Sequence, residues 1–201
     1  MKVPFRQQAS DFDCTPTSLI NALSYLFNRR DLPPFVIHRI YKDSLDEECA
    51  RGTSWRATQD LAFFLNNYKE NRFKNFAVDS KYITGKQVHF KRNSKIARCL
   101  NSNGVAVICV HLNWGEWHSM LGFQSDGEWL YCYDPAPRTK RFIVNDAVQF
   151  IPTIKRHDPN LKIRLDWLDK DFSQTENSDE RKYVFGDNDD RECLLLNRIH
   201  I

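Results

Sequence analysis

A change in the spacing of apolar residues near Gly104 constrains the fold more than any other feature of this 201-residue chain. Before Gly104 the apolar residues recur at steps of three and four, which is the period of amphipathic helices. After it, the run Val105–Leu112 is almost continuously apolar and rich in β-branched residues, which predicts a buried strand. Helices followed by antiparallel strands are typical of the α+β class. We therefore expect one α+β domain over residues 1–201, in which 169–191 is a polar, loop-rich segment.

Three helices are expected in the first half of the chain. The first begins at Pro16, which suits a first helical turn, and ends near residues 28–31. The second follows Leu32-Pro33-Pro34, and the third is capped by Gly52-Thr53-Ser54 after a polar loop at 43–51. Their apolar faces are formed by Leu19, Ile20, Leu23, Leu26 and Phe27, by Val36, Ile37, Ile40 and Tyr41, and by Leu61, Phe64, Leu65 and Tyr68.

The signal weakens between Asn71 and Arg92, where no clear period is present. We expect a short strand at Gln87–Phe90 in this region. Asn93-Ser94 then predicts the cap of a short helix that runs through Ile96–Leu100.

Antiparallel strands are expected in the second half. The turn Asn113–Glu116 and the hairpin signal Ser125-Asp126-Gly127 separate three consecutive strands, at Val105–Leu112, His118–Phe123 and Glu128–Tyr133. The elements expected further along are a strand at Arg138–Val144, a helix capped by Asn145 over Ala147–Phe150, a strand at Lys162–Trp167, a turn at Gly186–Asp190, and an edge strand within Cys193–Ile201.

Cys14 lies directly before the expected start of the first helix. A thiol at the N-terminal end of a buried helix meets the partial positive charge of the aligned peptide dipoles, which favours the thiolate. Cys14 is therefore a candidate nucleophile. Gln8, six positions upstream, can fold back and direct its side-chain amide at an oxyanion that forms beside Cys14.

These residues resemble the papain-like cysteine peptidases. Cys14-Thr15-Pro16-Thr17-Ser18-Leu19 is similar to the Cys-Gly-Pro-Thr-Ser-Leu motif of the C39-like branch, and the resemblance covers roughly the first three quarters of the chain. It implies a papain-like fold, in which N-terminal helices include a nucleophile helix that packs on a C-terminal antiparallel sheet. Thr15 departs from the glycine of the motif, and a β-branched residue cannot take the backbone angles open to glycine. This difference bears on the loop geometry and on access to the thiol.

The resemblance also implies a catalytic triad. The matching positions are His118, within Trp117–Phe123, and Asp134, within Leu130–Ala136. In the implied roles, Cys14 attacks a carbonyl carbon, and His118 holds the thiolate and later protonates the leaving group. Asp134 orients the imidazole, while Gln8 and the backbone N–H of Cys14 form the oxyanion hole.

Each candidate has a plain structural alternative. A lone cysteine is more often a core residue than a nucleophile, and His111 in the preceding strand competes with His118. Asp134 before Pro135 can simply begin a turn. The charges of Asp11 and Asp13 are interpreted as solvated loop charges, although a negative neighbour raises the pKa of a thiol. The remaining histidines show no metal-ligand spacing, and they are His38, His89, His157 and His200.

Composition excludes several classes of function. The net charge of +3, with basic and acidic residues interleaved, gives no argument for nucleic-acid binding. No apolar run is long enough to span a bilayer, which excludes the transporter-fused forms of the C39 family for this chain. The six cysteines include no C-x-x-C pair, which argues against a structural zinc site, and Cys109 and Cys132 are expected in the core. We expect neither a metal nor another cofactor.

The N-terminal sequence does not resemble a secretion signal, because Lys2, Arg6 and Gln7 interrupt any apolar stretch. A reduced, cytoplasmic setting is the plain interpretation, and a secreted mature form that has lost its leader is the alternative.

Together these patterns predict a thiol-dependent hydrolase, namely a cysteine peptidase or amidase that acts on a peptide or protein substrate through an acyl-enzyme. One alternative is an acyl or peptidyl transferase on the same triad, since the phytochelatin synthases also resemble the nucleophile region. Another is a catalytically silent binding module of the same fold, which Thr15 and the acidic residues beside Cys14 keep open. Specificity in such clefts comes from loops that carry no readable code, and the sequence indicates no oligomeric state.

Overall fold

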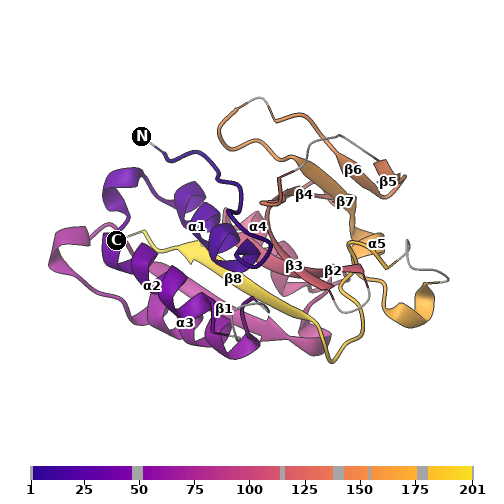
Figure 1. The fold of residues 1–201 in the computed structure, drawn as a ribbon, viewed down its shortest axis with the longest axis horizontal. Helices are drawn as coiled ribbons and strands as arrows, with labels where there is room; N and C mark the ends of the chain where they lie inside the picture. Colours follow the sequence, from indigo (N-terminus) through magenta and orange to yellow (C-terminus); the bar gives the residue numbers. More distant parts are fainter. Residues whose placement is uncertain are drawn as a thin grey trace.

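The computed structural model describes residues 2–46, 52–113, 116–137, 143–153, 155–175 and 181–200. Within these ranges the chain forms five α-helices and one eight-stranded antiparallel sheet (Figure 1). The expected α+β class is therefore confirmed. No helix in the described ranges is long and apolar enough to cross a membrane.

The helices cover both faces of the sheet. Helices α1 (Cys14–Leu26), α2 (Pro34–Ser44) and α3 (Trp55–Asn67) lie on one side, and α4 (Lys95–Asn101) packs on the other (Figure 1). A single short turn of helix, α5 (Leu165–Leu168), follows one of the last strands.

The expected starts of α3 and α4 agree with the structure, whereas α1 begins at Cys14, two residues before the expected Pro16. Ser54 caps α3 by accepting the N–H of Ala57 at 3.1 Å, and Ser94 caps α4 by accepting the N–H of Ala97 at 3.0 Å. Helix α1 ends at Leu26, slightly earlier than expected, because Phe27 takes an extended conformation and buries its ring fully. Its ring packs against that of Phe76, with centroids 4.8 Å apart.

The strands are β1 (Val78–Thr84), β2 (Val105–Asn113), β3 (Glu116–Ser125), β4 (Trp129–Tyr133), β5 (Ile143–Asn145), β6 (Val148–Phe150), β7 (Leu161–Arg164) and β8 (Glu192–Arg198). Their order across the sheet is β1-β8-β2-β3-β4-β7-β6-β5. The consecutive pairs β2–β3 and β3–β4 are antiparallel, so the three central strands predicted from the sequence are confirmed.

Several expected elements were wrong. No strand forms at 87–90, where a turn of 3-10 helix at Gly85–Gln87 leads into a loop, and the strand of this region is β1. The expected helix at 147–150 is strand β6, which pairs with β7 through Val148 and Ile163. The strand expected at 162–167 is β7, which ends at Arg164, and residues 165–167 belong to α5. The last strand, β8, is not an edge strand, because it lies between β1 and β2.

Other expectations fall partly outside the described residues. Of the strand expected at 138–144, residues 138–142 lie outside them, and β5 begins at Ile143. The turn expected at 113–116 includes 114–115, which also lie outside. Of the loop expected at 43–51, α2 extends to Ser44, and 47–51 lie outside.

The core consists of two apolar layers separated by the sheet. One layer joins α1, α2 and α3 to the sheet face that carries Val107, Leu121 and Leu194. The other joins α4 to the opposite face, which carries Ile108 and Met120. Because α1 packs on β2 and β3, its first residue, Cys14, lies beside β3.

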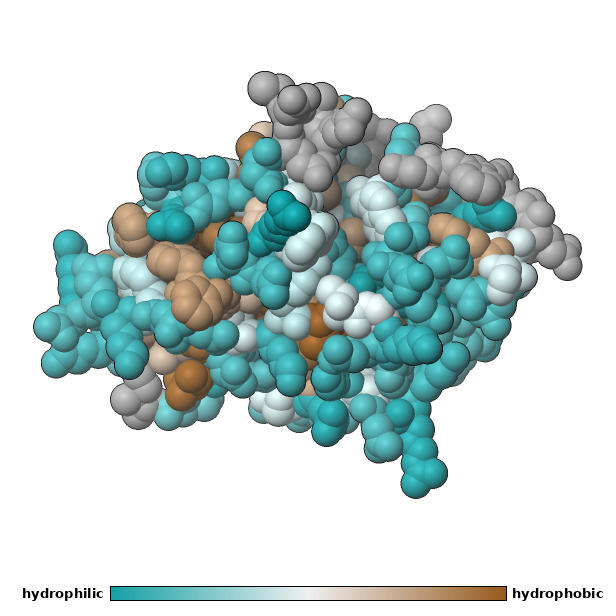
Figure 2. Space-filling view, turned by 90° about the horizontal axis from the view of Figure 1, so that it is seen from below, coloured by the Kyte–Doolittle hydropathy of each residue, from teal (hydrophilic) through white to brown (hydrophobic). Residues whose placement is uncertain are grey.

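The outer surface of α2 and α3 keeps exposed apolar residues. Phe35 and Phe63 are 53% and 71% exposed, and a groove between the two helices is lined by charged residues that include Arg39 and Asp60. Apolar side chains interrupt the polar surface on the side of the molecule where these helices lie (Figure 2). This groove involves none of the candidate catalytic residues.

Candidate functional site

The loop before α1 is folded around the carboxylate of Asp13. This side chain does not cap the helix but turns back, and it accepts the N–H groups of Ala9 and Ser10 at 3.0 and 2.7 Å. Burial raises the pKa of Asp13, but these hydrogen bonds outweigh it and hold the pKa below its usual value. Asp13 is only 6% exposed, so the interpretation of its charge as solvated was wrong, whereas Asp11 is exposed as expected.

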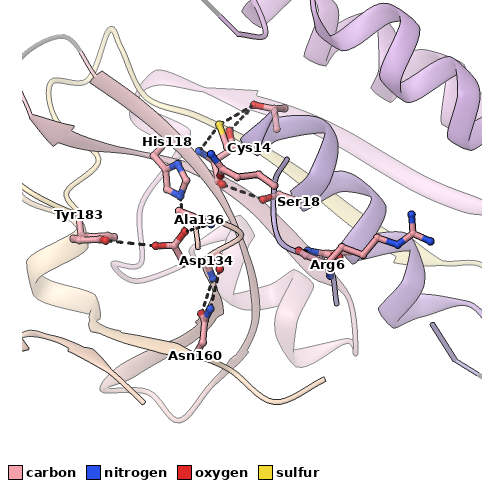
Figure 3. Close-up of polar contacts among 12 residues, drawn as sticks. Arg6, Cys14, Ser18, His118, Asp134, Ala136, Asn160 and Tyr183 are labelled. Atoms are coloured by element: carbon pink, nitrogen blue, oxygen red, sulfur yellow. Dashed lines mark hydrogen bonds and ion pairs between the residues drawn. The ribbon is translucent and has the colours of Figure 1, made fainter. Parts of the chain in front are cut away.

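Cys14 is the first residue of α1, and its thiol lies against the start of β3 (Figure 3). The N–H of Ser119 points at Sγ at 3.5 Å, and the hydroxyl of Thr15 lies 4.0 Å from Sγ. Thr15 and Ser119 are joined through their hydroxyls at 2.7 Å, and Ser18 of α1 donates to the carbonyl oxygen of Ser119 at 3.0 Å. The start of β3 is therefore fixed to the first turn of the helix.

Thr15 causes no backbone strain. Positive φ angles outside glycine occur, among the described residues, at Asn93, Asn103 and Tyr183, so Thr15 keeps ordinary helical geometry. Thr15, at the position of the motif's glycine, therefore places a hydroxyl beside the thiol without altering the backbone conformation.

His118 in β3 is paired with Asp134. Its Nε2 lies 2.7 Å from Oδ1 of Asp134, which leaves Nδ1 as the ring nitrogen for the thiol (Figure 3). Burial lowers the pKa of His118, but hydrogen bonds and charges from Asp134 and Cys14 outweigh it and raise the pKa to about 9. The imidazole is thus held in its protonated form at neutral pH.

The pKa of Cys14 moves in the opposite direction. Burial raises it, whereas the hydrogen bond and charge of His118, the N–H of Ser119 and the hydroxyl of Thr15 lower it, and the result lies below the usual value. The pKa of each other described thiol, at Cys99, Cys109, Cys132 and Cys193, is raised, mainly by burial. Cys109 and Cys132 are buried, as predicted.

Asp134 follows the last residue of β4 and is fully buried. Besides His118, its Oδ1 accepts the N–H of Ala136 at 2.8 Å, and the hydroxyl of Tyr183 lies 3.5 Å from Oδ2. Its backbone is held by the side-chain amide of Asn160 (Figure 3). Sequence reasoning missed Asn160, Tyr183 and Ser119. Only Ser119, next to His118, had a local signal.

Gln8 lies on the loop that leads to Cys14. Its Nε2 donates to the carbonyl oxygen of Ser10 at 2.8 Å, and its backbone N–H donates to the carbonyl oxygen of Pro135 at 2.9 Å. Oε1 of the same amide is buried without a hydrogen-bond partner. The structure thus joins Gln8 to the turn after Asp134, and its role in an oxyanion hole stays a prediction.

The competing histidine, His111, is not part of this arrangement. It is 3% exposed, neither ring nitrogen has a hydrogen-bond partner, and its ring lies 3.6 Å from that of Trp117. Burial lowers its pKa to about 4, although the charge of Asp187 acts in the other direction. His111 is therefore a neutral core residue, and His118 is the histidine that contacts a carboxylate.

The described residues contain no group of three or more His, Cys, Asp or Glu side chains placed to hold a metal ion. Comparison with known proteins gave no match to a family model and none to a curated protein.

Proposed function

We propose that Cys14, His118 and Asp134 are the catalytic triad of a thiol-dependent hydrolase with a papain-like, C39-like fold. The observation that carries the proposal is the opposite displacement of two pKa values. The pKa of Cys14 is lowered while that of His118 is raised to about 9, which describes a thiolate–imidazolium pair. Strongly perturbed groups with a specific charge partner are typical of catalytic sites.

The arrangement of the elements supports the papain-like assignment. The nucleophile begins a helix that packs on an antiparallel sheet, and the histidine and the carboxylate come from the neighbouring strand β3 and the end of β4. These are the places that the resemblance implies for them. The chain order Gln8, Cys14, His118, Asp134 is also the one it implies.

The chemistry follows from the geometry. The thiolate of Cys14 attacks the carbonyl carbon of an amide, and the negative charge moves to the carbonyl oxygen. His118 donates its Nδ1 proton to the leaving amine, the C–N bond breaks, and a thioester with Cys14 remains. Neutral His118 then takes a proton from water, whose oxygen attacks the thioester. Release of the acid restores the thiolate–imidazolium pair.

The substrate class proposed is a peptide or another amide. Two large apolar side chains next to the site in sequence remain exposed, Phe12 before Cys14 and Trp117 before His118. Exposed aromatic residues beside catalytic groups suit an extended chain that bears side chains.

Alkylation by iodoacetamide tests the proposal. The rate at Cys14 is measured from pH 5 to 9 in the wild type and in His118→Ala, with Cys14→Ala as the blank and mass spectrometry to locate the label. We expect labelling of Cys14 to persist well below the free-thiol pKa of roughly 8.5 and to require His118. If Cys14 instead reacts no faster than the buried thiols, whatever residue occupies position 118, the hydrolase proposal fails and a binding module becomes the better interpretation.

A second assay separates hydrolysis from transfer. Once a cleaved amide is found, its products are compared with and without an added thiol or amine. The proposal predicts a free acid in both cases. An acyl group carried over to the acceptor would instead identify a transferase on the same triad.

A further inference from the structure

Asn160 extends the pairing of β4 with β7 beyond its last backbone pair. The ladder ends at Cys132 and Leu161, and the backbone N–H of Asn160 still donates to the carbonyl oxygen of Cys132 at 3.0 Å. Beyond that point the side chain of Asn160, and not its backbone, makes the hydrogen bonds. Its Oδ1 accepts the N–H of Asp134 at 2.7 Å, and its Nδ2 donates to the carbonyl oxygen of Asp134 at 2.8 Å.

Both backbone polar groups of Asp134 are therefore held by one side chain, although Asp134 lies beyond the end of β4 at Tyr133 (Figure 3). A side-chain amide can replace a neighbouring strand in this way because it carries one acceptor and one donor, like a peptide group. With its main chain fixed, the carboxylate of Asp134 keeps Oδ1 at 2.7 Å from Nε2 of His118.

The same turn supports the other side of the site. The carbonyl oxygen of Pro135 accepts the N–H of Gln8 at 2.9 Å, so the loop that leads to Cys14 is attached directly after Asp134. A shift of the turn would therefore move the carboxylate away from His118 and move Gln8 relative to the thiol.

We propose that Asn160 is a positioning residue that fixes the turn at Asp134 and Pro135, and through it the alignment of His118 and Gln8 with Cys14. This inference rests on the proposed triad. It assigns to Asn160 no contact with substrate.

The test is Asn160→Ala, followed by the pH dependence of Cys14 alkylation and by NMR titration of His118. We expect the pKa of His118 to fall from about 9 and the labelling rate at pH 6 to fall by about 10- to 100-fold, because small displacements of reacting groups have effects of that size. Asn160→Gln keeps both amide atoms on a longer side chain. It should shift the profile in the same direction by less, and it supplies the measurement if the alanine variant does not fold.

Asn66 offers a matched control, because it holds Ser80 by the same two hydrogen bonds. Its Nδ2 donates to the carbonyl oxygen of Ser80 at 2.7 Å, and its Oδ1 accepts the N–H of Ser80 at 2.6 Å. Ser80 lies in β1, which β8 and β2 separate from β3. Asn66→Ala should therefore lower stability but leave the alkylation profile of Cys14 unchanged.

The outcomes are distinguishable. An unchanged profile in both Asn160 variants, or an equal shift in Asn66→Ala, would overturn the positioning role while the triad stands. Wild-type Cys14 that fails to react at low pH would instead reject the triad itself.

Discussion

Replacing Asp134 by asparagine tests the energetic basis of the proposed ion pair. Asp134 is fully buried and lies 2.7 Å from His118. The pKa of His118 rises from 6.5 to about 9, which at roughly 1.4 kcal/mol per pH unit corresponds to about 3 kcal/mol in favour of the imidazolium. Burial alone would lower this pKa. Without the carboxylate, we therefore expect the pKa of His118 to fall well below 9, since only the thiolate is left to oppose burial.

The loss should be transmitted to the thiol. The imidazolium of His118 lowers the pKa of Cys14, and a neutral imidazole no longer does so. A thiol returned to a pKa of roughly 8.5 is less than about 1% ionised at pH 6. The alkylation rate of Cys14 at pH 6 should therefore fall on the order of 100-fold, while the rate at pH 9 should change little.

The assay is the rate of iodoacetamide labelling at Cys14 between pH 5 and 9, with an NMR titration of the His118 ring. Asp126→Asn is the control, because Asp126 accepts two backbone N–H groups in the β3–β4 turn and contacts none of the three triad residues. Superimposable profiles for wild type and Asp134→Asn would refute the claim that this carboxylate holds the pair.

Three further predictions concern stability. His111 has a pKa of about 4 in the folded chain, so between pH 6.5 and 4 only the unfolded chain binds its proton. The free energy of unfolding should therefore fall by at most about 3 kcal/mol as the pH falls through this window. In urea denaturation measured at a series of pH values, His111→Phe should remove this pH dependence. Asp13→Ala should lower the free energy of unfolding by about 1 to 3 kcal/mol and speed proteolysis of the preceding loop, because the N–H groups of Ala9 and Ser10 lose a charged acceptor. Gly186→Ala should lower the melting temperature more than Gly127→Ala, since both have positive φ but only at Gly186 would a Cβ meet the His111 ring, at 2.6 Å.

The elements that could be predicted from the sequence are those that bury mainly apolar side chains. Helices α1 to α3 and strands β2 to β4 each present a regular apolar pattern. Strand β1 does not. Its third residue, Ser80, is polar but buried, and its hydroxyl donates to the carbonyl oxygen of Ala62 at 2.6 Å. Exposed Asp79 and Lys81 lie on either side of it. A pattern that counts apolar residues therefore missed this strand.

Some residues of the candidate site could likewise be predicted from the sequence, and others could not. The residues of the proposed triad could be chosen from the sequence because each stands in a local motif, whereas Asn160 and Tyr183 reach Asp134 from 26 and 49 positions away. No local pattern marks such partners, because only the pairing of β4 with β7 and the return of the C-terminal segment bring them close. Their support for Asp134 had to be read from the structure.

Asp13 shows how an acidic residue can precede a thiolate without opposing it. As the N-cap of α1, its carboxylate would usually bond to the first-turn N–H groups and place a negative charge beside Cys14. Instead it turns back to accept the N–H groups of Ala9 and Ser10, and within α1 it accepts only the hydroxyl of Thr17, at 3.3 Å, and no first-turn N–H. The positive end of the helix dipole is then left to the thiolate. The carboxylate of Asp13 therefore leaves these N–H groups free, and the pKa of Cys14 is lowered by His118, Ser119 and Thr15.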